Sequence, residues 1–572
     1  MNTQARNPGY ISMLLFLMLA ACTNPEKPGV DSILFNAKAY TLESESPWAE
    51  AVAIKDNLIV YVGDNEGALA LSGKNTIERD LNGQMLLPGF IDTHMHPIGG
   101  GAYAKALALD TSASVEDWVT AIAAYDQANP DAALIFGYGF LASTFGPTGP
   151  TRQMIDAVVS ERPVLIMDEG FHGAWANSLA LEKLNISQDT PDPVPGFSYY
   201  KRDAEGEATG YLLEGTAGSA MDSLNVITED IITDGTAYVI DVLNQYGVTS
   251  VFDAGAPNDE ATLIRVLKQL ESDGDMTIRI VGSYRPPNQE AANTAVAKAN
   301  NRRATVKGKR YHYRMLKIMQ DGTIEGRTAA MFEDYQGEPG NNGKTVFTEQ
   351  QMSLMVVGAA AEQIDVHIHA LGERAIYDAL NAIEVARSTY PDSETRYTIC
   401  HIEVIADDDM PRFAELDVTA QSTPLWASYD TYGKQFVSED QFNRYFRFNS
   451  LHKLGTRLTW GSDFPASGAG MLGMSPIYQM EIGRTRQNAG DPDAPIQPRT
   501  SERLGIDTLI RGYTIDAAWQ LHMENEIGSL KIGKKADLVV LDNNLFEVDL
   551  YNTHKVKVVM TILDGHVVYK RK

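Results

Sequence analysis

His94-Met95-His96 is the stretch of this chain whose residue types and spacing are most suited to chemistry. On a β-strand, alternate side chains share a face, so the two histidines point the same way and Met95 points the other way. Two imidazoles placed like this can bind one metal ion. The pattern does not require a metal, because two histidines near a strand end can also be solvated or hydrogen-bonded. The glycines at 99–101 suit a loop whose backbone passes close to another group.

Four further polar residues follow other apolar, strand-like runs, namely Lys317, His369, His401 and Asp463. Each has an ordinary explanation: a hydrogen-bonded core histidine, a salt bridge from Lys317 to Asp321, or a turn residue at Asp463. In a (β/α)8 barrel, however, functional groups gather at the C-terminal ends of the strands. Four of the 11 histidines, one lysine and one aspartate at such ends predict a site for a pair of metal ions.

The strand candidates that support a barrel number eight. They are residues 86–96, 246–255, 276–284, 313–322, 364–372, 396–405, 416–425 and 456–465. Segments with helical periodicity separate most of them, which is the pattern of a TIM barrel. We therefore expect an α/β fold with the barrel spanning residues 85–522.

Two other regions surround this barrel. Residues 31–84 and 523–572 are rich in short strands and turns, so we expect both ends of the chain to form one small, discontinuous β-sandwich. Residues 100–235, between the first two barrel strands, are too long for an unstructured loop. They predict an inserted subdomain over the barrel mouth, where substrate specificity would lie.

Composition excludes one class of partner. The chain has 572 residues, 44% of them hydrophobic and 9% aromatic, which is ample for a globular core. Its net charge of −27 argues against nucleic acid, whose phosphates would repel it. A small-molecule substrate is the expected partner, and a homodimer is possible.

The N-terminus has the features of a processing signal. Arg6 precedes an apolar run at 11–19, and Leu19-Ala20-Ala21-Cys22 closes the segment. Small residues before a cysteine resemble a bacterial lipoprotein signal, with residues 1–21 removed, Cys22 lipidated and 22–30 a tether. This predicts a lipid anchor in the cell envelope, at the outer membrane facing the periplasm. The alternative is an ordinary secretory signal with an incidental cysteine.

Several motifs resemble the amidohydrolase superfamily, specifically the amidohydrolase-3 group of YtcJ-like and N-substituted formamide deformylase-like proteins. The similar stretches are PGFIDTHMH, RPVLIMDEGFHGAWANSLAL, RMLKIMQDGTIEGRTA, VHIHALGERAIYDALNA, TICHIEV, LTWGSDFP and GSLKIGKKADLVVLD. Glu373 stands where the family commonly has aspartate, and Gly139-Phe140-Leu141 replaces a GWD-like triplet. The first change affects residues that support the ligands, and the second removes a polar substrate contact.

The resemblance implies roles for these residues. His94 and His96 would bind the more buried of two divalent ions, most simply Zn2+, and His369 and His401 the more exposed one. A carboxylated Lys317 would bridge both ions, since burial near metals frees a lysine amine to react. A single ion with Lys317 as a plain amine is the alternative. Asp463 would contact the bridging water, accept its proton and pass it to the leaving nitrogen. His367 would support the ligands without binding metal.

The implied activity is hydrolysis of a non-peptide C–N bond, in an amide, N-formyl or cyclic amide, by metal-activated hydroxide attack on the carbonyl. The same site suits an ester, lactone or carbamate. Substrate contacts are expected from His172, Trp175, Asn177 and Arg327, although packing explains each equally well. A non-catalytic, surface-anchored binding protein and a transport-associated binding lipoprotein are the other classes, and neither accounts for an intact ligand set.

Overall fold

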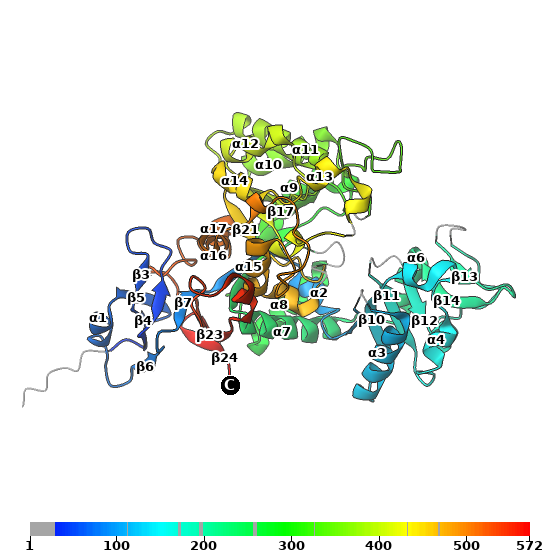
Figure 1. Ribbon diagram of the computed structural model, residues 1–572, viewed down its shortest axis with the longest axis horizontal. Coiled ribbons are helices and arrows are strands. Elements are labelled where there is room, and N and C mark those ends of the chain that lie inside the picture. Colours follow the sequence, from blue (N-terminus) through cyan, green and yellow to red (C-terminus); the bar gives the residue numbers. More distant parts are fainter. Residues whose placement is uncertain are drawn as a thin grey trace, which may run out of the picture.

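The computed structural model describes residues 29–110, 113–169, 173–193, 198–255, 260–324, 326–431, 433–466 and 469–572. Figure 1 shows the chain from its N-terminal sheets through the central barrel, with the insertion standing to one side. The predicted signal peptide, Cys22 and His172 lie outside the described residues.

The centre of the molecule is an eight-stranded parallel sheet in the order β21-β20-β19-β18-β17-β16-β15-β8. Its strands are β8 (Phe90–Met95), β15 (Val248–Asp253), β16 (Arg279–Tyr284), β17 (Tyr311–Met319), β18 (Asp365–Ala370), β19 (Tyr397–His401), β20 (Val418–Ser422) and β21 (Leu458–Trp460). All eight predicted strands are therefore confirmed. Most are buried along their whole length, as expected for parallel strands covered on both faces.

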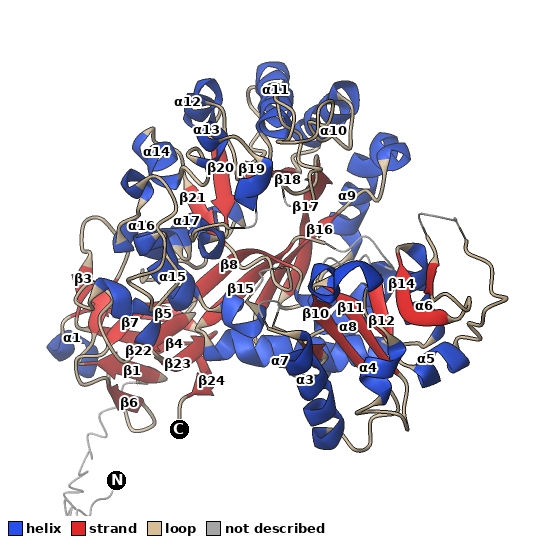
Figure 2. Cartoon of the chain, turned by 45° about the vertical axis from the view of Figure 1, so that its right-hand side comes forward, coloured by secondary structure: helices blue, strands red, loops and turns tan. Residues whose placement is uncertain are grey.

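The sheet nearly closes into a barrel, because its first and last strands meet. The Thr93 hydroxyl donates to the Trp460 carbonyl at 2.7 Å, and the Asp463 amide donates to the His94 carbonyl at 2.7 Å. Helices surround the strands (Figure 2). They are α7 (Glu229–Gln245), α8 (Glu260–Asp273), α9 (Ala292–Thr305), α10 (Glu349–Ala361), α11 (Glu373–Thr389), α12 (Met410–Glu415), α13 (Glu439–Phe442), α14 (Phe448–Lys453), α15 (Pro476–Thr485), α16 (Ile506–Gly512) and α17 (Ile515–Gln520).

The segment expected to begin the first barrel strand is in fact two strands. Residues Met85–Pro88 form β7, which pairs with β22 (Leu538–Leu541) and β2 (Lys38–Tyr40) in another sheet. The chain then turns at Gly89 and enters the barrel as β8. A Cβ on Gly89 would lie 2.3 Å from the Thr249 hydroxyl oxygen, so this crossing requires glycine.

Both ends of the chain contribute to one six-stranded sheet, β24-β23-β22-β7-β2-β3, and a four-stranded sheet, β5-β4-β1-β6, lies beside it. The remaining strands are β1 (Ser32–Phe35), β3 (Trp48–Ala49), β4 (Ala51–Lys55), β5 (Leu58–Gly63), β6 (Ile77–Asp80), β23 (Val558–Leu563) and β24 (His566–Lys570), with helix α1 (Asn65–Leu69). One hydrophobic cluster includes Leu34 and Val52 of the smaller sheet and Leu538 and Ile562 of the larger. The two sheets therefore share a core.

The long segment between β8 and β15 contains a separate six-stranded sheet in the order β13-β14-β12-β11-β10-β9. Its elements are β9 (Leu107–Ala108), α3 (Val115–Ala128), β10 (Ile135–Phe140), α4 (Arg152–Asp156), β11 (Val164–Asp168), β12 (Gly173–Ala176), α5 (Ser178–Lys183), β13 (Tyr200–Arg202), β14 (Ala208–Leu213) and α6 (Gly215–Ser223). Two apolar clusters, one containing Leu165 and Leu212 and the other Trp118 and Trp175, give this region its own core.

The glycines at 99–101 lie in a short helix, α2 (Pro97–Gly101), where we expected a loop. The expected close approach is nevertheless present. A Cβ on Gly101 would lie 2.4 Å from the Thr236 hydroxyl oxygen, and one on Gly235 would lie 1.8 Å from the Gly101 carbonyl oxygen. Glycine lets α2 pack directly on α7. Helix α2 carries the chain from the first metal-ligand candidates toward the insertion.

Candidate metal centre

His94 and His96 lie at the C-terminal end of β8 and face Asp463, which follows β21. Asp463 Oδ1 lies 3.4 Å from His94 Nε2 and 3.3 Å from His96 Nε2. The His96 Nδ1 atom contacts the Gly255 carbonyl at 2.7 Å, which leaves Nε2 directed at Asp463. The ligand atoms of these three residues lie within 4.8 Å of one another, a spacing at which they can hold a metal ion. His96 is the most exposed of these three residues, with 24% of its side chain exposed, so the group is open on that side.

Lys317, near the end of β17, lies beside this group. Its Nζ atom is 3.5 Å from His94 Nε2 and 3.2 Å from the sulfur of Cys400. The side chain is completely buried, and burial lowers the pKa of the ammonium group. The structure gives no bond between Lys317 and Asp321, the salt-bridge partner suggested by the sequence, among the residues it describes.

His369 and His401 come from the ends of the next two strands. Their ring centroids are 4.4 Å apart, and the centroid of His401 is 4.7 Å from that of His94. Burial, with the positive charge of Lys317 adding to it, holds the pKa values of all three histidines well below the ordinary value. The imidazoles are therefore neutral and retain a lone pair for a metal.

One observation tests whether these residues fit a metal. The Nδ1 atom of His401 is buried and has no hydrogen-bond partner among the described residues. A buried polar nitrogen without a partner costs free energy unless something occupies its lone pair. Neutral imidazoles, a carboxylate and an orphaned nitrogen together form a donor set suited to Zn2+.

Buried aspartates hold the candidate ligands in place; the sequence suggested only a salt bridge to Lys317 for Asp321 and no role for Asp92. Asp92, two residues before His94, accepts hydrogen bonds from the His94 and Ser462 amides, each at 3.1 Å. Asp321 accepts from the amides of Leu371 at 3.1 Å and Gly372 at 2.9 Å, which fixes the turn after His369. Burial raises the pKa of both carboxyls to about 7. The alternation Asp92, His94, His96 was the available signal, since all three share one strand face.

His367 lies on the same strand face as His369, but further inside the barrel. Its Nε2 atom is 2.9 Å from His94 Nδ1, so its ring fixes the orientation of His94. The ligand atoms of His94, His367 and Cys400 also lie within metal-binding distance of one another. Glu373, the departure from the family pattern, is buried and accepts a hydrogen bond from Arg444.

The residues expected to touch substrate have partners inside the protein. Asn177 caps α5, accepting from the Ala180 amide at 2.9 Å, and donates to the Arg162 carbonyl at 2.9 Å. The Trp175 indole is buried and donates to the Thr151 carbonyl at 2.8 Å. Arg327 forms an ion pair with Glu338 at 2.6 Å. Each of these side chains has a structural role that needs no ligand.

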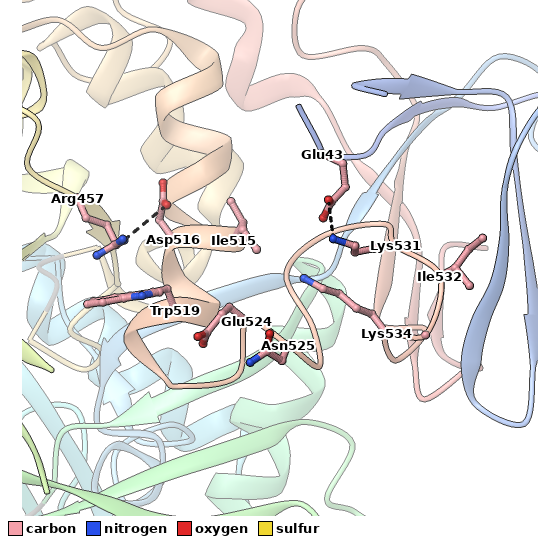
Figure 3. A pocket seen from close by; sticks show the side chains of 11 residues that line it. Glu43, Arg457, Ile515, Asp516, Trp519, Glu524, Asn525, Lys531, Ile532 and Lys534 are labelled. Carbon is pink, nitrogen blue, oxygen red and sulfur yellow. Dashed lines mark ion pairs between the residues drawn. The ribbon is translucent and has the colours of Figure 1, made fainter. Parts of the chain in front are cut away.

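A separate pocket lies elsewhere. A cavity of about 560 Å3 is lined by Arg457, Asp516, Trp519, Lys531 and Lys534, among others (Figure 3). Arg457 immediately precedes β21, whereas Asp463 follows it, so this cavity lies at the opposite end of the barrel from the histidines. Two ion pairs lie in its wall, as Figure 3 shows: Arg457 with Asp516 and Lys531 with Glu43.

Comparison with known proteins identifies the family. The amidohydrolase family model (Amidohydro_3) matches residues 78–569, most of the chain. This chain belongs to the amidohydrolase family. The expected superfamily is thereby confirmed.

Individual relatives of this amidohydrolase align over nearly its whole length. It is 26% identical to YtcJ of Bacillus subtilis over 540 residues, which cover 93% of this chain and 98% of that protein. It is 25% identical to the N-substituted formamide deformylase of Arthrobacter pascens over 554 residues, or 95% and 98% of the two chains. A solved structure of an uncharacterized metal-dependent hydrolase from Pyrococcus horikoshii has a TM-score of 0.72 at 24% identity, covering 91% of this chain and 99% of that one. This last likeness supports the fold.

Proposed function

We propose that this protein is a metal-dependent hydrolase that cleaves a non-peptide C–N bond in a small molecule. The observation that carries the proposal is the convergence of His94, His96 and Asp463, whose ligand atoms lie within 4.8 Å of one another at the ends of two barrel strands. Strand ends are where barrel enzymes place reacting groups. Family membership points to the same chemistry.

Two divalent ions, most simply Zn2+, fit the donor set. His94 and His96 would hold one, His369 and His401 would hold the other, and a carboxylated Lys317 would be the ligand shared by both. When bound, the ions would supply two effects: a lower pKa for water and polarisation of the substrate carbonyl. The lowered pKa of buried Lys317 supports its carboxylation, because only a neutral amine reacts with CO2.

Asp463 moves the proton. Its carboxylate lies between the His94 and His96 rings, and its position is fixed by the hydrogen bond from its own amide to the His94 carbonyl. It accepts the proton of the attacking water and delivers it to the departing nitrogen. Without that delivery the amine would leave as an unstable anion.

The first substrates to test are N-formyl and N-acyl amines, since one relative is named as an N-substituted formamide deformylase. Cyclic amides follow, and esters, lactones and carbamates form the alternative class, because attack on a polarised carbonyl does not select the leaving group. A non-catalytic binding protein is the remaining alternative. It has no need of the orphaned His401 nitrogen or of a buried lysine whose pKa is lowered by burial.

Metal analysis by mass spectrometry, followed by an activity screen, tests the proposal. We expect one to two equivalents of metal and turnover of at least one acyl compound. His94→Asn should lose both, while His452→Asn, an exposed histidine on α14, should lose neither. Folded protein that binds no divalent ion would overturn the hydrolase assignment. Metal-loaded protein with no turnover of any acyl compound would favour the binding protein.

Cellular placement is a separate proposal, based on the N-terminal sequence. We propose that Cys22 carries the lipid and holds the enzyme at the outer membrane, facing the periplasm. In the part of the chain that the structure describes, no helix has the length and apolar character to cross a bilayer. Cys22→Ala should move the protein from the membrane fraction to the soluble fraction, and an unchanged distribution would exclude the anchor.

The end sheets and the insertion form two further structural units. We propose that the two sheets sharing Leu34, Val52, Leu538 and Ile562 in one core form the β-sandwich, with β7 added to residues 31–84 and 523–572. Residues 100–235 are the specificity subdomain. We also propose that two copies of the chain form a homodimer, and the molecular mass measured by sedimentation tests this.

A further inference from the structure

Arg285 follows directly after β16 and is not among the ligand candidates. Strand β16 lies between β15, which leads to Gly255, and β17, which carries Lys317. Pro286 and Pro287 come next in the chain, and a proline restricts the residue before it to extended conformations. The position of Arg285 is therefore set by a strand on one side and by two prolines on the other.

The backbone of Gly255 lies between Arg285 and the candidate metal ligand His96. A Cβ built on Gly255 would lie 3.4 Å from the Arg285 Cβ, and the Gly255 carbonyl is the group that His96 contacts at 2.7 Å. The charge of Arg285 also reaches the site. Burial is the main cause of the lowered pKa values of His369 and Lys317, and the positive charge of Arg285 lowers both further.

The guanidinium group has no counter-charge. Its Nε atom is buried without a hydrogen-bond partner, and no ion pair involves Arg285 in the described ranges of the chain. Burial alone lowers the pKa of this group, with no carboxylate acting against it. The absence is unusual in a protein with 75 acidic and 48 basic residues. Arg279, on the same strand, pairs with Asp537 at 2.9 Å.

A half-buried cation that no described residue neutralises is costly to maintain. It becomes favourable when a bound anion supplies the missing charge, and the planar fork of a guanidinium matches a carboxylate with two parallel hydrogen bonds. The metal centre alongside would hold the carbonyl to be cleaved. A substrate with a carboxylate next to its acyl-nitrogen bond would place its carbonyl at the metal centre and its negative charge at Arg285.

We propose that Arg285 binds a carboxylate of the substrate, so that this enzyme acts on N-formyl or N-acyl amino acids in preference to neutral amides. This inference rests on the hydrolase function proposed above. Arg285 is thereby a specificity residue. It contacts the part of the substrate that does not react.

A matched substrate pair tests the proposal on the metal-loaded full-length enzyme. N-formylmethionine and N-formylmethioninamide have the same bond to cleave and differ in the negative charge. We expect kcat/KM to favour the acid by about 10- to 100-fold, the range for hydrogen bonds to a charged group. Arg285→Gln should remove this preference and leave the amide within about 2-fold of wild type. Arg285→Lys should retain part of it.

Arg265→Gln is the matched control, because it removes an exposed arginine on α8 whose charge is already neutralised by Glu229 at 2.9 Å. It should keep the full preference for the acid. Equal kcat/KM values for acid and amide in the wild type would overturn the proposal. So would a preference that survives in Arg285→Gln, or one lost equally in Arg265→Gln.

A binding measurement separates this inference from the hydrolase function. N-methylsulfonylmethionine and its amide lack a cleavable carbonyl on nitrogen, so calorimetric titration reports affinity without turnover. We expect the acid to bind about 10-fold or more tightly than the amide, and Arg285→Gln to abolish the difference. If no acyl compound is hydrolysed but this difference is found, the hydrolase function fails and the anion site stands. If hydrolysis occurs and acid and amide bind equally, the anion site fails alone.

Discussion

The amine nitrogen of Lys317 lies 3.2 Å from the sulfur of Cys400, with both side chains buried inside the barrel. Burial lowers the pKa of the lysine and raises the pKa of the thiol to about 12. The thiol therefore stays protonated and supplies no negative charge to hold an ammonium ion. Burial favours the neutral amine, the form that carboxylation requires, and outweighs the opposite effect of the Asp463 carboxylate on the pKa of Lys317.

The first prediction concerns this lysine. Lys317→Ala should reduce bound metal to one equivalent or less, because the variant lacks the carbamate oxygens that would bind the ions. Short carboxylates such as acetate or propionate, added at high concentration, should restore part of the metal content by occupying the vacated space. Metal content is measured by mass spectrometry after gel filtration.

Lys534→Ala is the control for that experiment. Lys534 is also a buried lysine, but its Nζ atom donates to the Ile527 carbonyl at 3.0 Å, far from the histidines. It should retain wild-type metal content. Normal metal occupancy in Lys317→Ala would show that Lys317 does not bridge the ions.

The second prediction concerns Asp463. Asp463→Asn keeps the shape of the side chain and removes the proton acceptor, so kcat should fall by about 100-fold or more. Metal should remain largely bound, since the histidines are intact. Asp440→Asn, an exposed partner of Arg444 on α13, is the control and should behave as wild type. Retained turnover in Asp463→Asn would exclude it as the proton carrier.

The barrel and the clustering of the candidate ligands were predictable from sequence because both depend on short-range patterns. Buried parallel strands are continuous apolar runs, and the polar residue that ends each run marks the catalytic face. His94, Lys317, His401 and Asp463 were found in this way. Arg285 is also a polar residue that ends an apolar strand. In the sequence, however, an arginine before two prolines fits a turn as well as a ligand site.

Long-range pairing explains what the sequence analysis missed. Met85–Pro88 joined the wrong sheet in the prediction because its partner, Leu538–Leu541, lies at the far end of the chain. Periodicity within the segment cannot reveal a partner so distant. The helix at Pro97–Gly101 escaped notice for a similar reason, since its glycines are explained by Gly235 on α7.

The third prediction addresses the junction of the barrel with the end sheets. Arg279, at the start of β16, donates to Asp537 at 2.9 Å and also pairs with Asp564, and Arg279 and Asp537 are both buried. Asp537→Asn leaves the arginine only one carboxylate, so the free energy of unfolding should fall by about 3 kcal/mol. Urea denaturation followed by circular dichroism measures this loss.

A double variant distinguishes the ion pair from simple packing. If the pair is responsible, Arg279→Met combined with Asp537→Asn should be less destabilised than the sum of the two single variants. Additive losses would mean that Arg279 and Asp537 act independently.

The fourth prediction is a pH dependence at the N-terminal end of the barrel. Asp365 accepts hydrogen bonds from Arg314 Nε at 2.6 Å and the Arg396 amide at 2.9 Å, and lies 3.3 Å from His522 Nδ1. Burial raises the pKa of its carboxyl, but His522 and Arg314 outweigh burial and leave it below the ordinary value of 3.8. Since the folded pKa is lower than the unfolded one, the stabilisation is complete above about pH 4 and is lost as pH falls through the folded pKa.

Asp365→Asn should therefore melt at a lower temperature than wild type at pH 7, by an amount equivalent to about 3 kcal/mol. The difference should stay constant down to about pH 4 and shrink below it, because the wild-type carboxyl then takes up a proton. Asp417→Asn removes an exposed carboxylate at the same end of the barrel, 3.6 Å from Arg457 and 3.9 Å from Arg387, and should change the melting temperature little at any pH. A difference for Asp365→Asn that is independent of pH below 4 would mean that its loss acts through packing, because only the charged carboxylate makes the stabilisation depend on protonation.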